Sequence, residues 1–230
     1  MRPDEIHITF RDICLTGNLK IPHQARGLVI VAAGKDCPTL KVQNEYLFRM
    51  LNRHRFATLF TYLLDSADEQ EYDNPFDISK MSDSLLKITK WAFQQPALQS
   101  LPAGYFAANV AAAAALKASI KAGARIKAIV CRCGRPDLIN YELPLIKPPL
   151  LLITASENVY INEWNKQAYE LLNCEKEIVM LEGAVNSLEQ AGKAYKIAHL
   201  TTDWFEKHLI RNVMRLGGEM HDPAGIPAFP

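Results

Sequence analysis

The residues best placed to do chemistry lie in four short segments, each directly after a predicted strand. Ligands of an open, mostly parallel sheet bind beyond the carboxyl ends of its strands, so these segments are the first candidates for a site. They contain a thiol at Cys37, carboxamides at Asn109 and Asn186, and a carboxylate at Glu157. The four segments are residues 33–38, 107–111, 156–160 and 183–187.

A catalytic thiol at Cys37 would need a general base beside it. None of the six histidines falls on a predicted loop of the site; they are His7, His23, His54, His199, His208 and His221. A hydrolase that uses Cys37, or a serine such as Ser156 or Ser187, therefore stays an alternative. Cys131 and Cys133 form a C-x-C at a strand end with no second pair of ligands, which favours buried thiols over a zinc or redox site. We expect no metal and no cofactor.

The composition is that of a globular protein with a near-neutral charge. The 230 residues include 49% hydrophobic ones, and 26 Lys and Arg balance 25 Asp and Glu to give a formal charge of +1. That balance argues against a nucleic-acid binder, which needs a broad basic surface. No apolar run approaches the ~18 residues of a membrane span, and no secretory signal opens the chain. The five cysteines are odd in number and mostly embedded in apolar stretches, which favours a reducing cytoplasm over a disulfide framework.

The hydrophobic pattern predicts an α/β fold. The first 22 residues alternate like two antiparallel strands with a turn at Gly17-Asn18, and residues 27–33 form a continuous apolar run typical of a strand buried on both faces. After that run, strands and helices alternate. We expect strands at 57–64, 103–106, 126–131, 150–155 and 176–181, and helices at 43–54, 79–93, 161–172 and 189–208, with an alanine-rich helix directly after residue 106. The pattern predicts a mostly parallel sheet with helices on both faces, as one domain over residues 1–211 with a Gly/Pro-rich tail at 212–230.

Five segments resemble, in the right order, the dienelactone hydrolase-like branch of the α/β hydrolases. The resemblance extends from about residue 15 to 210. Gly104 to Leu116 is similar to the nucleophile elbow, G-x-S-x-G followed by a helix of small residues. The other segments are Val31–Gly34, like the strand that opens the oxyanion loop, Cys131–Leu138, like the stretch after the sixth strand, and residues 154–157 and 183–186, like the acid and histidine loops. The resemblance implies an α/β-hydrolase fold.

Two of the three triad positions that the resemblance implies have lost their chemistry. Asn109 stands at the nucleophile position, and a carboxamide cannot be activated for attack as a hydroxyl or thiol can. Asn186 stands at the base position, and its amide has no useful proton affinity near neutral pH. Only the acid position keeps its chemistry, as Glu157. The sequence therefore predicts a pseudoenzyme, a hydrolase fold without the hydrolase triad.

The elbow itself is expected to survive the loss of the nucleophile. The elbow residue adopts a positive φ, which asparagine tolerates, and Ala107 and Ala111 replace the two glycines of the motif with other small residues. The backbone N–H of Val110 would then point out of a helix N-terminus, a place that favours anions, and Lys35 would add a positive charge. We expect a small carboxylate-type ligand, bound without turnover by Gly34, Lys35, Cys37, Asn109 and Val110.

Other assignments stay open at this point. Arg132 and Arg135 lie near the rim of the predicted site and would pair either with an anionic ligand or with Glu142. A protein partner or a second copy of the chain is an alternative to the small anion, with the tail at 212–230 as a candidate docking segment.

Overall fold

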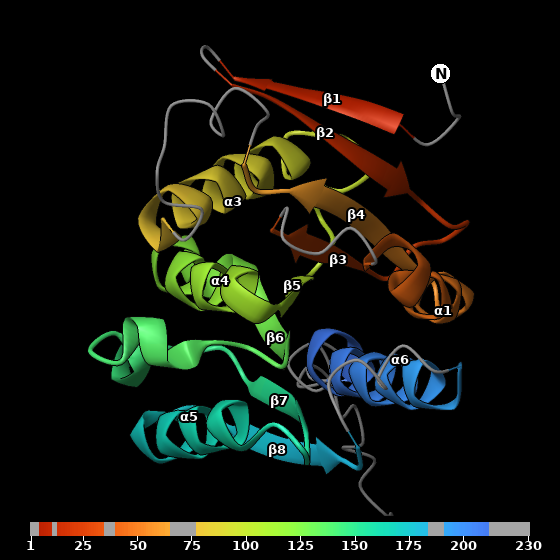
Figure 1. Cartoon of the computed structure of the whole chain (residues 1–230). Coiled ribbons are helices and arrows are strands. Elements are labelled where there is room, and N and C mark those ends of the chain that lie inside the picture. Colours follow the sequence, from red (N-terminus) through yellow and green to blue (C-terminus); the bar gives the residue numbers. More distant parts are fainter. Residues whose placement is uncertain (1–4, 11–12, 35–39, 65–76, 184–190, 212–230) are drawn as a thin grey trace, which may run out of the picture.

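The computed structural model describes residues 5–10, 13–34, 40–64, 77–183 and 191–211. The strands of this part of the chain are β1 (Glu5–Phe10), β2 (Ile13–Lys20), β3 (Gly27–Ala33), β4 (Phe56–Tyr62), β5 (Ala103–Ala108), β6 (Ile126–Arg132), β7 (Leu150–Ala155) and β8 (Lys176–Leu181). They form one eight-stranded sheet in the order β1-β2-β4-β3-β5-β6-β7-β8 (Figure 1). β2 runs antiparallel to both β1 and β4, and all other pairs are parallel. The predicted fold class is confirmed.

Helices cover both faces of the sheet. They are α1 (Leu40–Arg53), α3 (Ile78–Ala92), α4 (Asn109–Ala122), α5 (Val159–Leu171) and α6 (Ala191–Phe205), which continues into a π-helical segment, Glu206–Arg211. Figure 1 shows α3, α4 and α5 on one side of the sheet and α1 and α6 on the other. Short 3₁₀ turns complete the described part, at Gly123–Arg125, Pro136–Ile139 and Leu143–Leu145.

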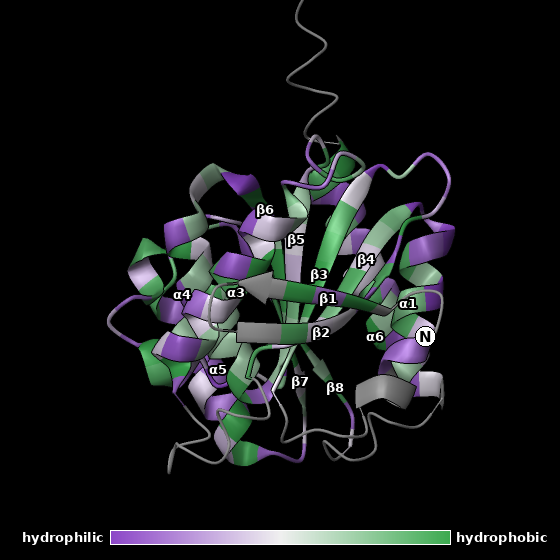
Figure 2. Ribbon diagram, turned by 90° about the horizontal axis from the view of Figure 1, so that it is seen from above, coloured by the Kyte–Doolittle hydropathy of each residue, from purple (hydrophilic) through white to green (hydrophobic). Residues whose placement is uncertain are grey.

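The core is divided by the sheet into two layers of buried side chains. β3, β5 and β7 are buried along their whole length, as expected for strands covered on both faces, and Figure 2 shows β3 and β5 running between the covering helices. The alanine run of α4, residues 111–115, is at most 1% exposed. Its small side chains let the helix axis lie close to the sheet.

The turn predicted at Gly17-Asn18 is wrong, because both residues lie inside β2. A Cβ atom on Gly17 would lie 2.6 Å from the main-chain oxygen of Phe60 on β4, so the glycine serves a close approach of two strands. The predicted tail at 212–230 lies outside the described residues.

Strand register brings the predicted site segments to one edge of the sheet. Ala32 of β3 lies opposite Ala107 of β5, and Ala108 lies opposite Arg132 of β6, which in turn lies opposite Ile153 of β7. The carboxyl ends of four neighbouring strands therefore meet at the edge where a ligand of this fold is expected.

Candidate functional site

The connection at Asn109 has the shape of a nucleophile elbow. β5 ends at Ala108 and α4 begins at the next residue, so no loop separates strand from helix. Asn109 has a φ of 52°, in the left-handed region that asparagine tolerates better than most other residues. The positive φ predicted for Asn109 is confirmed.

Small residues let the loop after β6 pack against the first turn of α4. A Cβ atom on Gly134 would lie 2.8 Å from the Cβ of Ala112, closer than such atoms approach in ordinary packing. The backbone N–H of Arg135 donates a hydrogen bond of 3.2 Å to the main-chain oxygen of Asn109. The elbow is therefore held by β5 on one side and by this loop on the other.

A buried cation lies at the end of the strand beside the elbow. Arg132 is the last residue of β6, pairs in register with Ala108, and is 8% exposed. A guanidinium keeps its charge at every relevant pH. The first turn of α4, with the N–H of Val110, adds the positive end of a helix dipole at the same edge. A buried guanidinium and a helix N-terminus therefore lie at the same edge of the sheet.

The two thiols beside Arg132 are buried and neutral. Cys131 and Cys133 are 1% and 3% exposed. Burial raises the pKa of both, and it raises that of Cys133 to about 11 although the charge of Arg132 and a hydrogen bond to the backbone of Ala155 act in the opposite direction. Neither is a thiolate at neutral pH, so neither is a ready nucleophile. Among the described residues, no group of three His, Cys, Asp or Glu could hold a metal ion.

The loops after β7 and β8 are tied together. The N–H of Gly183 donates to the Oγ of Ser156 at 2.9 Å, and the N–H of Glu157 donates to the oxygen of Gly183 at 3.3 Å. The Glu157 side chain is exposed, while the Oδ1 of Asn158 accepts from the N–H of Ile161 and caps α5. The predicted acid loop and the start of the predicted histidine loop therefore lie side by side.

Two buried asparagines of α5 anchor this edge, and neither was among the predicted site residues. The Nδ2 of Asn162 donates to the main-chain oxygens of Ala155 and Ser156, at 2.9 and 3.1 Å. The Nδ2 of Asn165 donates to the oxygen of Gly134 at 3.0 Å. Both residues are buried, 6% and 0% exposed, and two asparagines on the apolar face of a helix were the available signal.

The open assignment of Arg135 and Glu142 is settled by their contacts. The Arg135 guanidinium binds both carboxylate oxygens of Asp137 at 2.8 to 3.2 Å and stacks over the ring of Trp164 at 4.0 Å. Glu142 pairs instead with Lys117 at 3.1 Å. Arg135 therefore braces the loop after β6, and Arg132 is the arginine that the structure puts beside the elbow.

Some predicted site residues can be placed and others cannot. Gly34 is buried at the end of β3, Val110 is 6% exposed, and Asn109 is partly exposed. Lys35, Cys37 and Asn186 lie outside the described residues, as does Ser187. The roles given to Asn109, Glu157 and Asn186 as triad equivalents stay predictions.

None of the described histidines lies in a predicted site segment. They lie on β1, before β3, after α1, on α6 and in the π-helical segment, and none of them follows the carboxyl end of a parallel strand. Ser156, the described serine in the predicted acid loop, accepts a hydrogen bond from Gly183. No described helix combines the length and the apolar character that crossing a lipid bilayer requires.

Comparison with known proteins identifies the family. No protein-family model matches the sequence. The crystal structure of dienelactone hydrolase from Anabaena variabilis is 31% identical, superposes with a TM-score of 0.81, and is matched over 91% of this chain and 100% of its own. This chain belongs to the dienelactone hydrolase family.

Other relatives share either the sequence or the fold. Proteins from two strains of Mycobacterium tuberculosis, both named "Putative phosphoribosyl transferase", are 32% identical over 209 residues, which is 91% of this chain and 47% of theirs. The chain thus spans about half the length of these curated relatives. The esterase domain of a Rhodothermus marinus protein is 13% identical with a TM-score of 0.73, over 91% of this chain and 100% of that domain, and shares the fold.

Proposed function

We propose that this member of the dienelactone hydrolase family is a non-catalytic protein that binds a small carboxylate-type ligand at its elbow. Asn109 carries the proposal, because it has the positive φ of an elbow residue but presents a carboxamide there. The amide nitrogen shares its lone pair with the carbonyl group and does not attack a carbonyl carbon near neutral pH. An elbow that keeps its shape without a nucleophile supports binding without turnover.

The surroundings of Asn109 support an anion as the ligand. The N–H of Val110 is one of the donors that the first turn of a helix leaves without an intrahelical partner. The Asn109 amide offers a second donor, and the buried charge of Arg132 at the neighbouring strand end favours a negative group. Lys35 follows Gly34 directly in the sequence and is proposed as a second cation.

Calorimetric titration with fumarate and acetate tests this proposal. The Asn109→Asp variant keeps the size of the side chain and adds a negative charge, so we expect it to bind fumarate at least tenfold more weakly. Asn140→Asp, on an exposed residue outside the elbow, is the matched control and should bind as the unchanged protein does. If no small carboxylate binds, or if Asn109→Asp binds equally well, the elbow is not an anion site.

The alternative function is ester or lactone hydrolysis with a relocated nucleophile, for which Cys37 is the first candidate. Turnover of p-nitrophenyl acetate that Cys37→Ala abolishes, while Cys174→Ala leaves it intact, would establish this alternative and overturn the non-catalytic proposal. Back-substitution is the complementary experiment. A folded Asn109→Ser, Asn186→His double variant should gain esterase activity, and its failure would show that the loops are misaligned.

The mycobacterial relatives are named for a phosphoribosyl transferase activity. We infer that this activity belongs to the half of those proteins that this chain does not match, because the matched half has the fold of esterases and dienelactone hydrolases. Release of pyrophosphate from phosphoribosyl pyrophosphate by this chain alone would contradict the inference.

The alternative to a small carboxylate as the binding partner is another protein or a second copy of the chain. Light scattering at several concentrations, with and without residues 217–230, tests it.

A further inference from the structure

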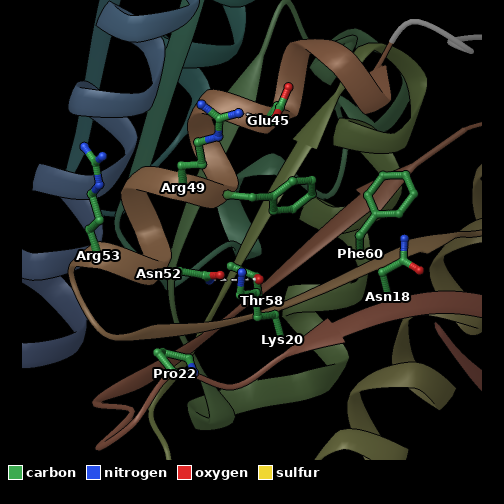
Figure 3. Close-up of a pocket in the computed structure, with 10 residues that line it drawn as sticks. Asn18, Lys20, Pro22, Glu45, Arg49, Asn52, Arg53, Thr58 and Phe60 are labelled. Atoms are coloured by element: carbon green, nitrogen blue, oxygen red, sulfur yellow. Dashed lines mark hydrogen bonds and ion pairs between the residues drawn. The ribbon is translucent and has the colours of Figure 1, made fainter. Parts of the chain in front are cut away.

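A groove of about 680 Å³ lies between α1 and the sheet, within the size range of small-molecule sites (Figure 3). Side chains of β2 and β4 form its floor, where Lys20 pairs in register with Thr58 and Asn18 with Phe60, and α1 forms its wall. β3 lies between β4 and β5, so a strand separates the groove from the strand that carries the elbow. We name this cavity the β2–α1 groove.

The apolar part of the groove is built from two aromatic rings. Phe48 of α1 and Phe60 of β4 meet edge to face, with 5.9 Å between ring centroids and 84° between ring planes. Phe60 is 5% exposed and also meets Tyr62 edge to face, with 5.1 Å between ring centroids. Phe48 is only half-buried, so part of its ring is open to a ligand. An aromatic group placed there would extend an existing ring cluster.

The charged part of the groove has an excess of positive charge. Three basic side chains line it, Lys20, Arg49 and Arg53, against one carboxylate, Glu45. Arg49 and Glu45 are one helical turn apart and form an ion pair, and Figure 3 shows them together at one end of the wall. Within the described part of the chain, Lys20 and Arg53 form no ion pair. The groove therefore attracts an anion.

A fixed hydrogen bond lies on the floor next to Lys20. The Nδ2 of Asn52 donates to the main-chain oxygen of Phe56 and to the Oγ1 of Thr58, both at 3.1 Å. Figure 3 shows the bond to Thr58. These two bonds use both amide hydrogens and fix the orientation of the amide. Because the Thr58 oxygen accepts from Asn52, its own hydrogen is a donor for another group. Thr58 is only 3% exposed, so this donor is presented by a rigid part of the sheet.

We propose that the β2–α1 groove is a second binding site, and that its ligand is a small aromatic carboxylate. The aromatic ring lies against Phe48 and Phe60, and the carboxylate binds the Lys20 ammonium and the Thr58 hydroxyl. Lys20 and Thr58 are cross-strand neighbours, so the ammonium and the hydroxyl act on one anionic group together. The site is independent of the elbow and of its proposed ligand.

Calorimetry with 1-naphthoate tests the proposal, with 1-naphthalenemethanol as the neutral analogue. We expect naphthoate to bind at least tenfold more tightly than the alcohol. Lys20→Glu should weaken naphthoate binding at least tenfold. Lys127→Glu, another exposed lysine on a strand, is the matched control and should bind naphthoate as the unchanged protein does.

The elbow variant separates this site from the carboxylate site proposed above. Asn109→Asp should bind naphthoate normally, and loss of binding in that variant would place the ligand at the elbow and overturn the proposal. Equal binding by a folded Lys20→Glu variant, or no binding by the unchanged protein, would overturn it as well. A second readout needs no variant, because naphthoate should shift the side-chain amide NMR signals of Asn52. Unshifted Asn52 signals at saturation would refute the site.

Discussion

Substitution of Gly134 tests whether contact with α4 fixes the loop behind the elbow. In Gly134→Ala the new Cβ would lie 2.8 Å from the Cβ of Ala112, so the loop and the helix must separate by about 0.6 Å to reach the closest ordinary packing distance. Neither atom can rotate away, because each is attached directly to the main chain. Overpacking of this kind costs about 1–3 kcal/mol, and we expect about 2 kcal/mol here because the displaced loop also bonds Asn109 and Asn165.

Urea unfolding of four variants measures this contact. Ala112→Gly alone should cost about 1 kcal/mol through its lower helix propensity. In the double variant the clash is gone, so its loss of stability should fall short of the sum of the two single losses by at least about 1 kcal/mol. Gly192→Ala is the control, because a Cβ there meets nothing within 4 Å, and it should be neutral or slightly stabilising. Additive losses at Gly134 and Ala112, or a Gly134→Ala variant as stable as Gly192→Ala, would refute the packing argument.

Two further predictions concern buried or partly buried hydrogen bonds. Burial acts to raise the pKa of Glu206, but its bonds to His54 and Arg26, both 3.0 Å, outweigh burial and lower it. Glu206 therefore stabilises the fold above its unfolded pKa of about 4.3, and urea unfolding should show this contribution lost as the pH falls through the folded pKa, with a smaller loss in Glu206→Gln. Thr89→Val should cost about 1–3 kcal/mol in the same assay, because it leaves the buried hydroxyl of Tyr105, 2.7 Å away, without a partner, whereas Tyr105→Phe leaves Thr89 bonded to a main-chain oxygen and should cost less. Equal losses in these two variants would contradict the asymmetry, and a pH profile unchanged by Glu206→Gln would contradict the first prediction.

Local pattern was sufficient to predict the order and type of the elements. A continuous apolar run predicted β7 with the observed bounds, because such a run marks a strand that helices cover. The bounds predicted for β8 are also the observed ones, although that strand begins with Lys176 and Glu177 and is only partly buried. The helix predicted at 161–172 begins two residues earlier, at Val159, because Asn158 caps it. Gly17 was wrongly predicted to be a turn residue. A glycine is needed there because the main chain of β4 comes too close for a side chain, and β4 pairs with β2 from a distant part of the sequence.

The two candidate sites differ in how well they can be predicted from the sequence. The elbow is contiguous in sequence, so the resemblance of Gly104 to Leu116 to a nucleophile elbow was enough to predict the positive φ of Asn109. The β2–α1 groove depends on which strands are neighbours. Lys20 and Thr58 face each other only because β2 is inserted beside β4 rather than beside β3. No periodicity in either segment carries that information, and the groove was not predicted.

On the non-catalytic proposal, the elbow of this chain keeps its shape without the reaction of its family. Its shape depends on a residue that tolerates a positive φ, on a glycine where α4 meets the loop after β6, and on alanines that lie flat on the sheet. None of these requirements involves a nucleophile. Asparagine satisfies the first of them, since Asn109 has a φ of 52°, and the N–H of Val110 and the charge of Arg132 lie at the same edge of the sheet. The proposal therefore assigns to this edge the stabilisation of negative charge, which a carboxylate carries permanently, whereas the substrate of an esterase develops it only in the transition state.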